Sequence, residues 1–183
     1  HNNLGVALIR TGRPDAALPL LRKAHAAASQ GERKLTYAHI LAVLGDPSGV
    51  LDLLAAVEAA PALDEGWRYT GMGQYGPNMS RLDRLMVALG STRDRRATGA
   101  IIAKLELLKP EDAFSHFRAV ALALERLGDS AAAGPLAELL SRPGIGGHAT
   151  TTIQGAIQEA RKWPSWNATE PRSNAIRELI LSR

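Results

Sequence analysis

Apolar residues recur along this chain at the spacing of an amphipathic helix. Between residues 117 and 127 they lie three or four positions apart, which makes one face of a helix apolar. These positions are Phe117, Val120, Ala121, Leu124 and Leu127. A second stripe of the same kind holds Leu136, Leu139 and Leu140. Gly128 and Asp129 separate the two stripes, and glycine commonly ends a helix while aspartate caps the next one. The pattern predicts two helices joined by a short turn.

This helix–turn–helix pattern recurs four times. Glycines that close an apolar stripe mark the units: Gly12, Gly45, Gly90 and Gly128. Four residues before them stand Leu8, Leu41, Met86 and Leu124, and eight residues after them stand Leu20, Leu53 and Leu136. Ile101 matches this last column if the turn of the third unit holds three extra residues. Because one helix pair cannot bury both of its apolar faces, such pairs stack in arrays.

The sequence therefore predicts an all-α fold, an α-α superhelix of about four to five stacked antiparallel helix pairs. We expect one helical-repeat domain over residues 1–183. An irregular helical bundle is the alternative. The chain begins at His1 and ends at Arg183 inside helical patterns, which predicts a fragment of a longer protein.

Charged residues gather at the predicted turns. Asp46, Asp94 and Asp129 follow the glycines, where each can cap the next helix. Arginines cluster around the third unit, at Arg81, Arg84, Arg93, Arg95 and Arg96. We expect these arginines to link neighbouring units through turn aspartates; phosphate binding is the second interpretation.

An insertion at residues 61–80 interrupts the repeat. It is rich in glycine and holds five of the nine Trp, Tyr and Met residues of the chain. Long insertions in compact folds are often functional. Its candidate binding residues are Trp67, Arg68, Tyr69, Met72, Gln74 and Tyr75. Two interpretations are open: a ligand or partner surface, or a plug that fills the stack with aromatic side chains.

His116 and Arg118 lie near the start of a predicted helix and are the remaining candidates. We place them beside a groove next to the insertion, with local capping or pairing of His116 as the alternative. We find no catalytic residue set. The sequence has no cysteine, no HExxH pair, no G-x-S-x-G elbow and no Walker-type loop. No metal ligand set is expected.

Composition narrows the function classes. Hydrophobic residues make up 45% and charged residues 22%, and the net charge is +4. This mild charge disfavours a dedicated nucleic-acid binder. No apolar stretch approaches the roughly 20 residues that span a membrane, so no membrane span is expected.

The residues from Tyr37 onward resemble HEAT-like repeats, including those described in bilin lyases. The resemblance lies in Ala42–Pro47, in Ala88–Gly90 with Asp94–Ala97, and in Leu127–Ala131. The first unit resembles a tetratricopeptide repeat through Leu4, Gly5, Leu8, Gly12, Ala17, Leu21 and Ala24. Residues 66–76, 88–90 and 114–119 are similar to the helical C-terminal part of bacterial FAD-dependent oxidoreductase-like proteins. That resemblance implies FAD in an upstream domain. This chain has no G-x-G-x-x-G motif that opens a helix after a strand, so no cofactor is expected within it.

These observations predict a non-catalytic interaction or accessory domain that contacts a protein or another domain of its own chain. One alternative is a HEAT-like module that binds nucleic acid or another polyanion. The second alternative is a HEAT-like lyase or glycosylase.

Overall fold

The structure, a computed structural model, describes residues 12–65 and 79–162, and these residues form helices and turns without a strand. The all-α prediction is confirmed for this part of the chain. The α-helices are α2 (Pro14–Ala27), α3 (Glu32–Val43), α4 (Val50–Glu58), α5 (Arg81–Ser91), α6 (Arg96–Glu106), α7 (Phe114–Leu127), α8 (Ala133–Ser141) and α9 (His148–Lys162). Two short 3-10 helices, η1 (Pro47–Gly49) and η2 (Ser130–Ala132), precede α4 and α8.

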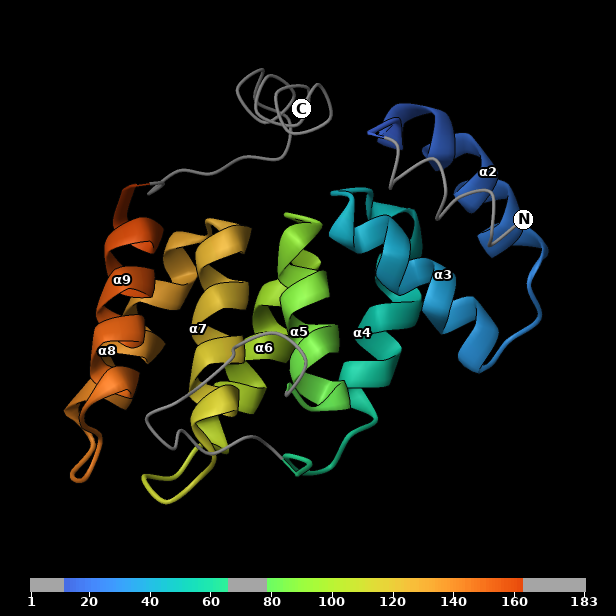
Figure 1. The fold of residues 1–183 in the computed structure, drawn as a ribbon. Coiled ribbons are helices and arrows are strands. Elements are labelled where there is room, and N and C mark those ends of the chain that lie inside the picture. The colour runs from blue at the N-terminus through green and yellow to red at the C-terminus, as the bar shows by residue number, and fades with distance from the viewer. Residues whose placement is uncertain (1–11, 66–78, 163–183) are drawn as a thin grey trace.

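The helices from α3 onward lie in two layers (Figure 1). In one layer α3, α5, α7 and α9 lie side by side, and each contacts the next. In the other layer α4, α6 and α8 follow in the same order. Successive helices therefore alternate between the layers, and α2 contacts α3 at one end. None of the described helices is both long and apolar enough to cross a membrane.

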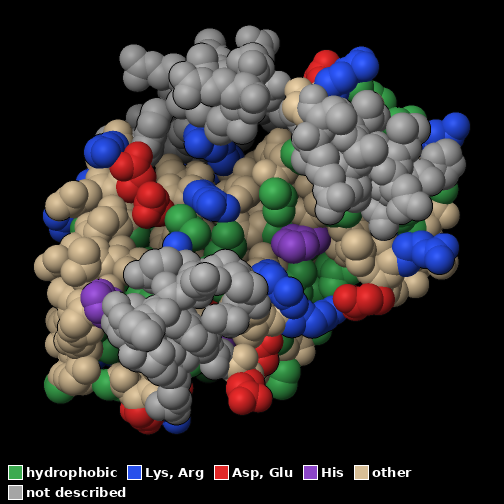
Figure 2. Space-filling view, in the orientation of Figure 1, with side chains coloured by type: hydrophobic (Ala, Val, Ile, Leu, Met, Phe, Trp, Pro, Cys, Tyr) green, Lys and Arg blue, Asp and Glu red, His purple; other side chains and the backbone are tan. Residues whose placement is uncertain are grey.

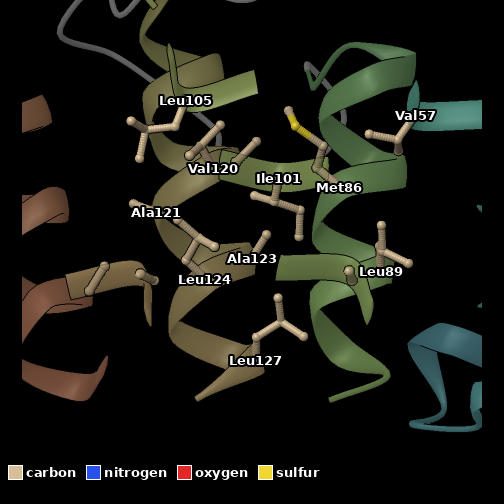
Figure 3. Close-up of a cluster of buried hydrophobic side chains, with 14 of the residues drawn as sticks. Val57, Met86, Leu89, Ile101, Leu105, Val120, Ala121, Ala123, Leu124 and Leu127 are labelled. Carbon is tan, nitrogen blue, oxygen red and sulfur yellow. The ribbon is translucent and has the colours of Figure 1, made fainter. Parts of the chain in front are cut away.

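The core lies between the two layers. Figure 3 shows Met86 of α5 and Leu124 of α7 on the facing sides of these helices, with Ile101 of α6 between them, and Leu89 on the other side of α5. All four side chains are completely buried, and burying one such side chain stabilises the fold by about 1.5–3 kcal/mol. A second, smaller cluster joins α2 to α3 and comprises Ala17, Leu18, Leu21 and Leu41.

The turns that follow α3, α5 and α7 share one geometry. Each contains a residue in the left-handed conformation: Gly45 at φ 78°, Arg93 at φ 56° and Gly128 at φ 61°. An aspartate follows and accepts a hydrogen bond from the backbone N–H two residues further on. These bonds run from Ser48 to Asp46 (2.9 Å), from Arg96 to Asp94 (3.0 Å) and from Ala131 to Asp129 (3.1 Å). The predicted capping role is confirmed for Asp46 and Asp129, which are the N-cap residues of η1 and η2, whereas the N-cap of α6 is Arg95 and Asp94 precedes it.

The prediction that Gly90 closes a helix is wrong. Helix α5 continues through Gly90 to Ser91, and Arg93 takes the left-handed position that glycine holds in the other two turns. Ile101 lies eight residues after Arg93, just as Leu53 lies eight residues after Gly45 and Leu136 eight residues after Gly128. The third unit therefore needs no extra residues in its turn when Arg93, rather than Gly90, is aligned with the other two glycines. The side chains of Leu53, Ile101 and Leu136 are all completely buried.

Substitutions at two of the left-handed turn residues should change the free energy of unfolding in opposite directions. A left-handed conformation strains residues that carry a Cβ by about 1–2 kcal/mol, partly offset by the entropy that glycine loses on folding. A Cβ on Gly45 would meet no atom within 4 Å, so its cost is conformational. We expect Gly45→Ala to lower the free energy of unfolding, and Arg93→Gly to raise it, by about 1 kcal/mol each. Urea denaturation measures both changes, and equal signs for the two variants would contradict the assignment.

Candidate functional site

The base of the insertion is built around a buried histidine. His116 lies in the first turn of α7 and is 3% exposed. Its Nδ1 is 2.7 Å from Oδ1 of Asp83 on α5, and its Nε2 is 2.8 Å from the backbone oxygen of Asp64. Asp83 is completely buried. We call Asp64, Asp83 and His116 the histidine clamp.

The clamp holds the chain on both sides of residues 66–78. On the entry side, the backbone oxygen of Asp64 accepts from His116, and its Oδ2 accepts from the N–H of Leu82 (3.0 Å). On the exit side, Ser80 and Asp83 form a capping box that begins α5. One histidine therefore fixes both described ends of the insertion relative to α7.

Both nitrogens of His116 face oxygen atoms, an arrangement that favours the doubly protonated imidazolium. Burial by itself would lower the pKa of His116, but the hydrogen bond and charge of Asp83, together with Asp64, raise it above its ordinary value. Burial would likewise raise the pKa of Asp83. Hydrogen bonds from His116 and Ser115, the charge of His116 and the N–H of Ser80 lower it instead. The clamp is thus a buried ion pair.

This arrangement does not suit nucleophilic catalysis. Ser115, His116 and Asp83 are the residue types of a catalytic triad, but the Ser115 side chain hydrogen-bonds to Asp83. A general base needs a ring nitrogen within reach of the nucleophile, and both nitrogens of His116 are already bound to other groups. The geometry suits a structural clamp.

Two pH limits follow for stability. Because the pKa of His116 is raised in the folded protein, its contribution is complete below its ordinary value of about 6.5 and is lost as the pH rises through the folded value. Because the pKa of Asp83 is lowered, its contribution is present above about 3.9 and is lost as the pH falls below that value. We expect urea midpoints to be highest between these limits. Asp83→Asn should reduce the loss of urea midpoint at alkaline pH, because His116 then has no carboxylate partner. An unchanged loss would contradict the His116–Asp83 ion pair.

The turn aspartates carry a second set of polar contacts, which join neighbouring units. Arg22 of α2 binds Asp46, and Arg95 before α6 lies 3.4 Å from Asp129, which also accepts from Thr98 Oγ1 (2.7 Å). Burial would raise the pKa of both aspartates, but these partners and backbone N–H groups lower it. The prediction that the clustered arginines link neighbouring units through turn aspartates is confirmed for Arg95, which pairs with Asp129.

The other clustered arginines have different environments. Arg96 pairs with Asp94 of its own turn (2.6 Å), and Arg81 pairs with Glu32 of α3 (2.7 Å). Arg84 is exposed on α5. Burial lowers the pKa of Arg93, an effect that the charge of Glu159 on α9 opposes.

Most of the predicted binding residues lie outside the described part of the chain: Trp67, Arg68, Tyr69, Met72, Gln74 and Tyr75. Of the two predicted residues that are described, His116 points into the α5–α7 interface, whereas Arg118 is half-buried. Two helical positions are about 200° apart, so the two side chains leave α7 in different directions. His116 is paired, but its partner Asp83 lies 33 residues away, so this is not the local pairing given as the alternative.

Sequence reasoning missed Asp83, Asp64 and Lys104. The spacing of Ser80 and Asp83 is a capping-box signal and was the available clue to Asp83. Lys104 of α6 is 6% exposed and donates to the backbone oxygen of Ala60, just beyond α4. Neither Asp64 nor Lys104 has a local sequence signal, because their partners lie 52 and 44 residues away.

Among the described residues, no group of three His, Asp or Glu side chains is placed to hold a metal ion. Comparison with known proteins found no family model, no curated protein and no solved structure that matches this chain. The resemblances seen in the sequence therefore stay predictions.

Proposed function

We propose that this chain is a helical-repeat interaction domain of the HEAT-like type, in which stacked helix pairs present an outer surface to another polypeptide. The recurrence of one turn geometry at residues 45–48, 93–96 and 128–131 carries the proposal. The completely buried residues at equivalent positions and the Arg–Asp links between units support the same repeat. We propose on these grounds a superhelical stack.

The distribution of buried polar groups supports a non-catalytic role. His116 and Asp83 bind each other, Asp129 binds Thr98 and Arg95, and Lys104 binds a backbone oxygen. Each of these groups joins two helices or a helix and a turn. Their hydrogen bonds stabilise the stack.

The sequence resemblance to the C-terminal part of FAD-dependent oxidoreductase-like proteins extends the proposal. In this role the domain is an accessory module of a larger protein, and FAD belongs to an upstream domain. The reading frame around residues 1–183 tests it. We expect an upstream dinucleotide-binding segment that retains FAD when purified and binds residues 1–183 in trans. A frame without such a segment would contradict the accessory role.

A polyanion-binding module is the second candidate, because arginines lie on α5 and α7 at Arg84, Arg118 and Arg126. Glu125 and Glu159 lie among the same charges: Glu125 acts on Arg126, and Glu159 acts on Arg93. A phosphate backbone carries a charge at every nucleotide and would meet these carboxylates, whereas a peptide can present a few separate acidic side chains to the arginines alone. Binding to a polypeptide therefore has the stronger support.

A further inference from the structure

Helices α5 and α7 lie side by side in a fixed register. Asp83 contacts His116, Gly90 lies against Ala123, and Arg126 Nη1 donates to Ser91 Oγ at 2.8 Å. Each residue of α5 is therefore level with the residue of α7 that follows it by 33 to 35 positions. Since level pairs recur from one end to the other, the two helices run parallel.

The register aligns the residues that these helices leave outside the core. On α5 they include Arg84, Val87 and Ser91, and on α7 they include Arg118, Leu122 and Arg126. The spacings of three, four, seven and eight residues place each set on one face of its helix. Arg84 is level with Arg118, Val87 with Leu122, and Ser91 with Arg126. We call these six residues the arginine strip.

The strip combines positive charge with an apolar centre. Arg84 and Arg126 are exposed, whereas Val87 and Leu122 are half-buried. Figure 2 shows Lys and Arg side chains over α5 and α7 with hydrophobic side chains among them. The charge of Arg84 on α5 reaches the neighbouring helix α3. There, burial and this charge together lower the pKa of His39. Burial also lowers the pKa of Arg126; the charge of Glu125 opposes this effect and the charge of Arg118 adds to it.

We propose that the arginine strip binds an acidic peptide segment that carries apolar side chains between its carboxylates. Charge complementarity selects the acidic residues, and Arg is enriched where protein interfaces carry most of their binding energy. Residues 66–78 contain no Asp or Glu, so that segment does not supply the acidic ligand. This inference rests on the proposed interaction role and names its surface and its partner.

The spacing of the strip sets the spacing of the ligand. Arg84 and Ser91 are seven residues apart, which is about 10 Å along a helix. A helical ligand that lies along α5 and α7 matches this distance with acidic residues at positions i and i+7. Leucines at i+3 and i+4 then lie over Val87 and Leu122. The bound segment thus carries acidic residues at positions i and i+7 and apolar residues at positions i+3 and i+4.

A synthetic helical peptide with this pattern tests the proposal against two other probes. One is the same peptide with Gln in place of each Glu, and the other is a DNA duplex of similar length. Fluorescence anisotropy with residues 1–183 should show binding of the Glu peptide that weakens as salt is added. The Gln peptide should bind at least about ten-fold more weakly, since two charge pairs are lost. Equal binding of the two peptides, no binding of either, or tighter binding of the DNA would overturn the proposal.

Variants of the strip make the test site-specific. Arg84→Ala and Arg126→Ala should each weaken the Glu peptide about three- to ten-fold. Lys23→Ala removes the same charge from an exposed position of α2 and should leave binding within about two-fold. Arg126→Glu should bind a peptide with Lys in place of Glu better than the wild-type protein does. Circular dichroism verifies folding of each variant.

The proposed function has a separate readout. If the strip variants bind both the Glu peptide and the upstream segment as well as the wild-type protein does, the strip proposal fails and the interaction role stands. If the strip variants lose both the peptide and the upstream segment, both proposals are supported. If the wild-type protein binds the Glu peptide but not the upstream segment, the accessory role fails and the strip proposal is supported.

Discussion

Gly90→Ala should destabilise the protein by about 2–3 kcal/mol, because it overpacks the core. A Cβ at this position would lie 2.4 Å from the backbone oxygen and 2.6 Å from the Cα of Ala123. Both atoms belong to the backbone of α7, so no side-chain rotation relieves the contact. Helices α5 and α7 would have to separate, which would loosen the buried contacts that join them along their length.

Gly99→Ala is the matched control. Gly99 is the fourth residue of α6 and is exposed, and a Cβ there meets no atom within 4 Å. Alanine is the better helix former, so we expect this variant to gain about 0.5–1 kcal/mol. Urea denaturation of both variants, with equal m-values, measures the difference. If Gly90→Ala were as stable as the wild-type protein, the close approach of α5 to α7 would be wrong.

Gly90 also shows how far the fold followed from the sequence. Hydrophobic periodicity correctly predicted an all-α fold for the described residues, because the stripes are long and regular. It misassigned the third turn, because glycine serves two physical purposes: a left-handed turn at Gly45 and Gly128, and a close helix approach at Gly90. The aspartate that follows each turn was the better marker, since Asp94 follows Arg93 as Asp129 follows Gly128.

The candidate site was less predictable than the fold. His116 stood out by residue type, but the sequence did not indicate that its partners would be Asp83 and Asp64, which are 33 and 52 residues away. Such pairs form only once the register of α5 and α7 is set by packing. The arginine strip was missed for the same reason. Arg84 and Arg118 belong to different predicted clusters in the sequence, and only the parallel register places them level.

His116→Ala is expected to destabilise the protein by about 3–5 kcal/mol, the range for removing one partner of a buried ion pair. The variant leaves the buried Asp83 carboxylate without its cation and the Asp64 backbone oxygen without its donor. Both groups are then partly desolvated without compensation. Because the clamp fixes both described ends of the insertion, we also expect faster hydrogen exchange at Leu82 and Asp83 than the overall loss of stability explains. Urea denaturation and hydrogen exchange measure the two effects.

His148→Ala is the control for the loss of a histidine. His148 is exposed at the start of α9, and its ring meets the edge of Phe114 at a centroid distance of 6.0 Å. Its loss should therefore cost at most about 1 kcal/mol. A double-mutant cycle of His116→Ala with Asp83→Asn separates the ion pair from the other bonds of each residue. We expect the double variant to be more stable than the sum of the single losses predicts, because Asp83→Asn removes the unpaired charge that makes His116→Ala costly. Additive losses would show that His116 and Asp83 act independently, and the buried ion pair would then be the wrong description of this site.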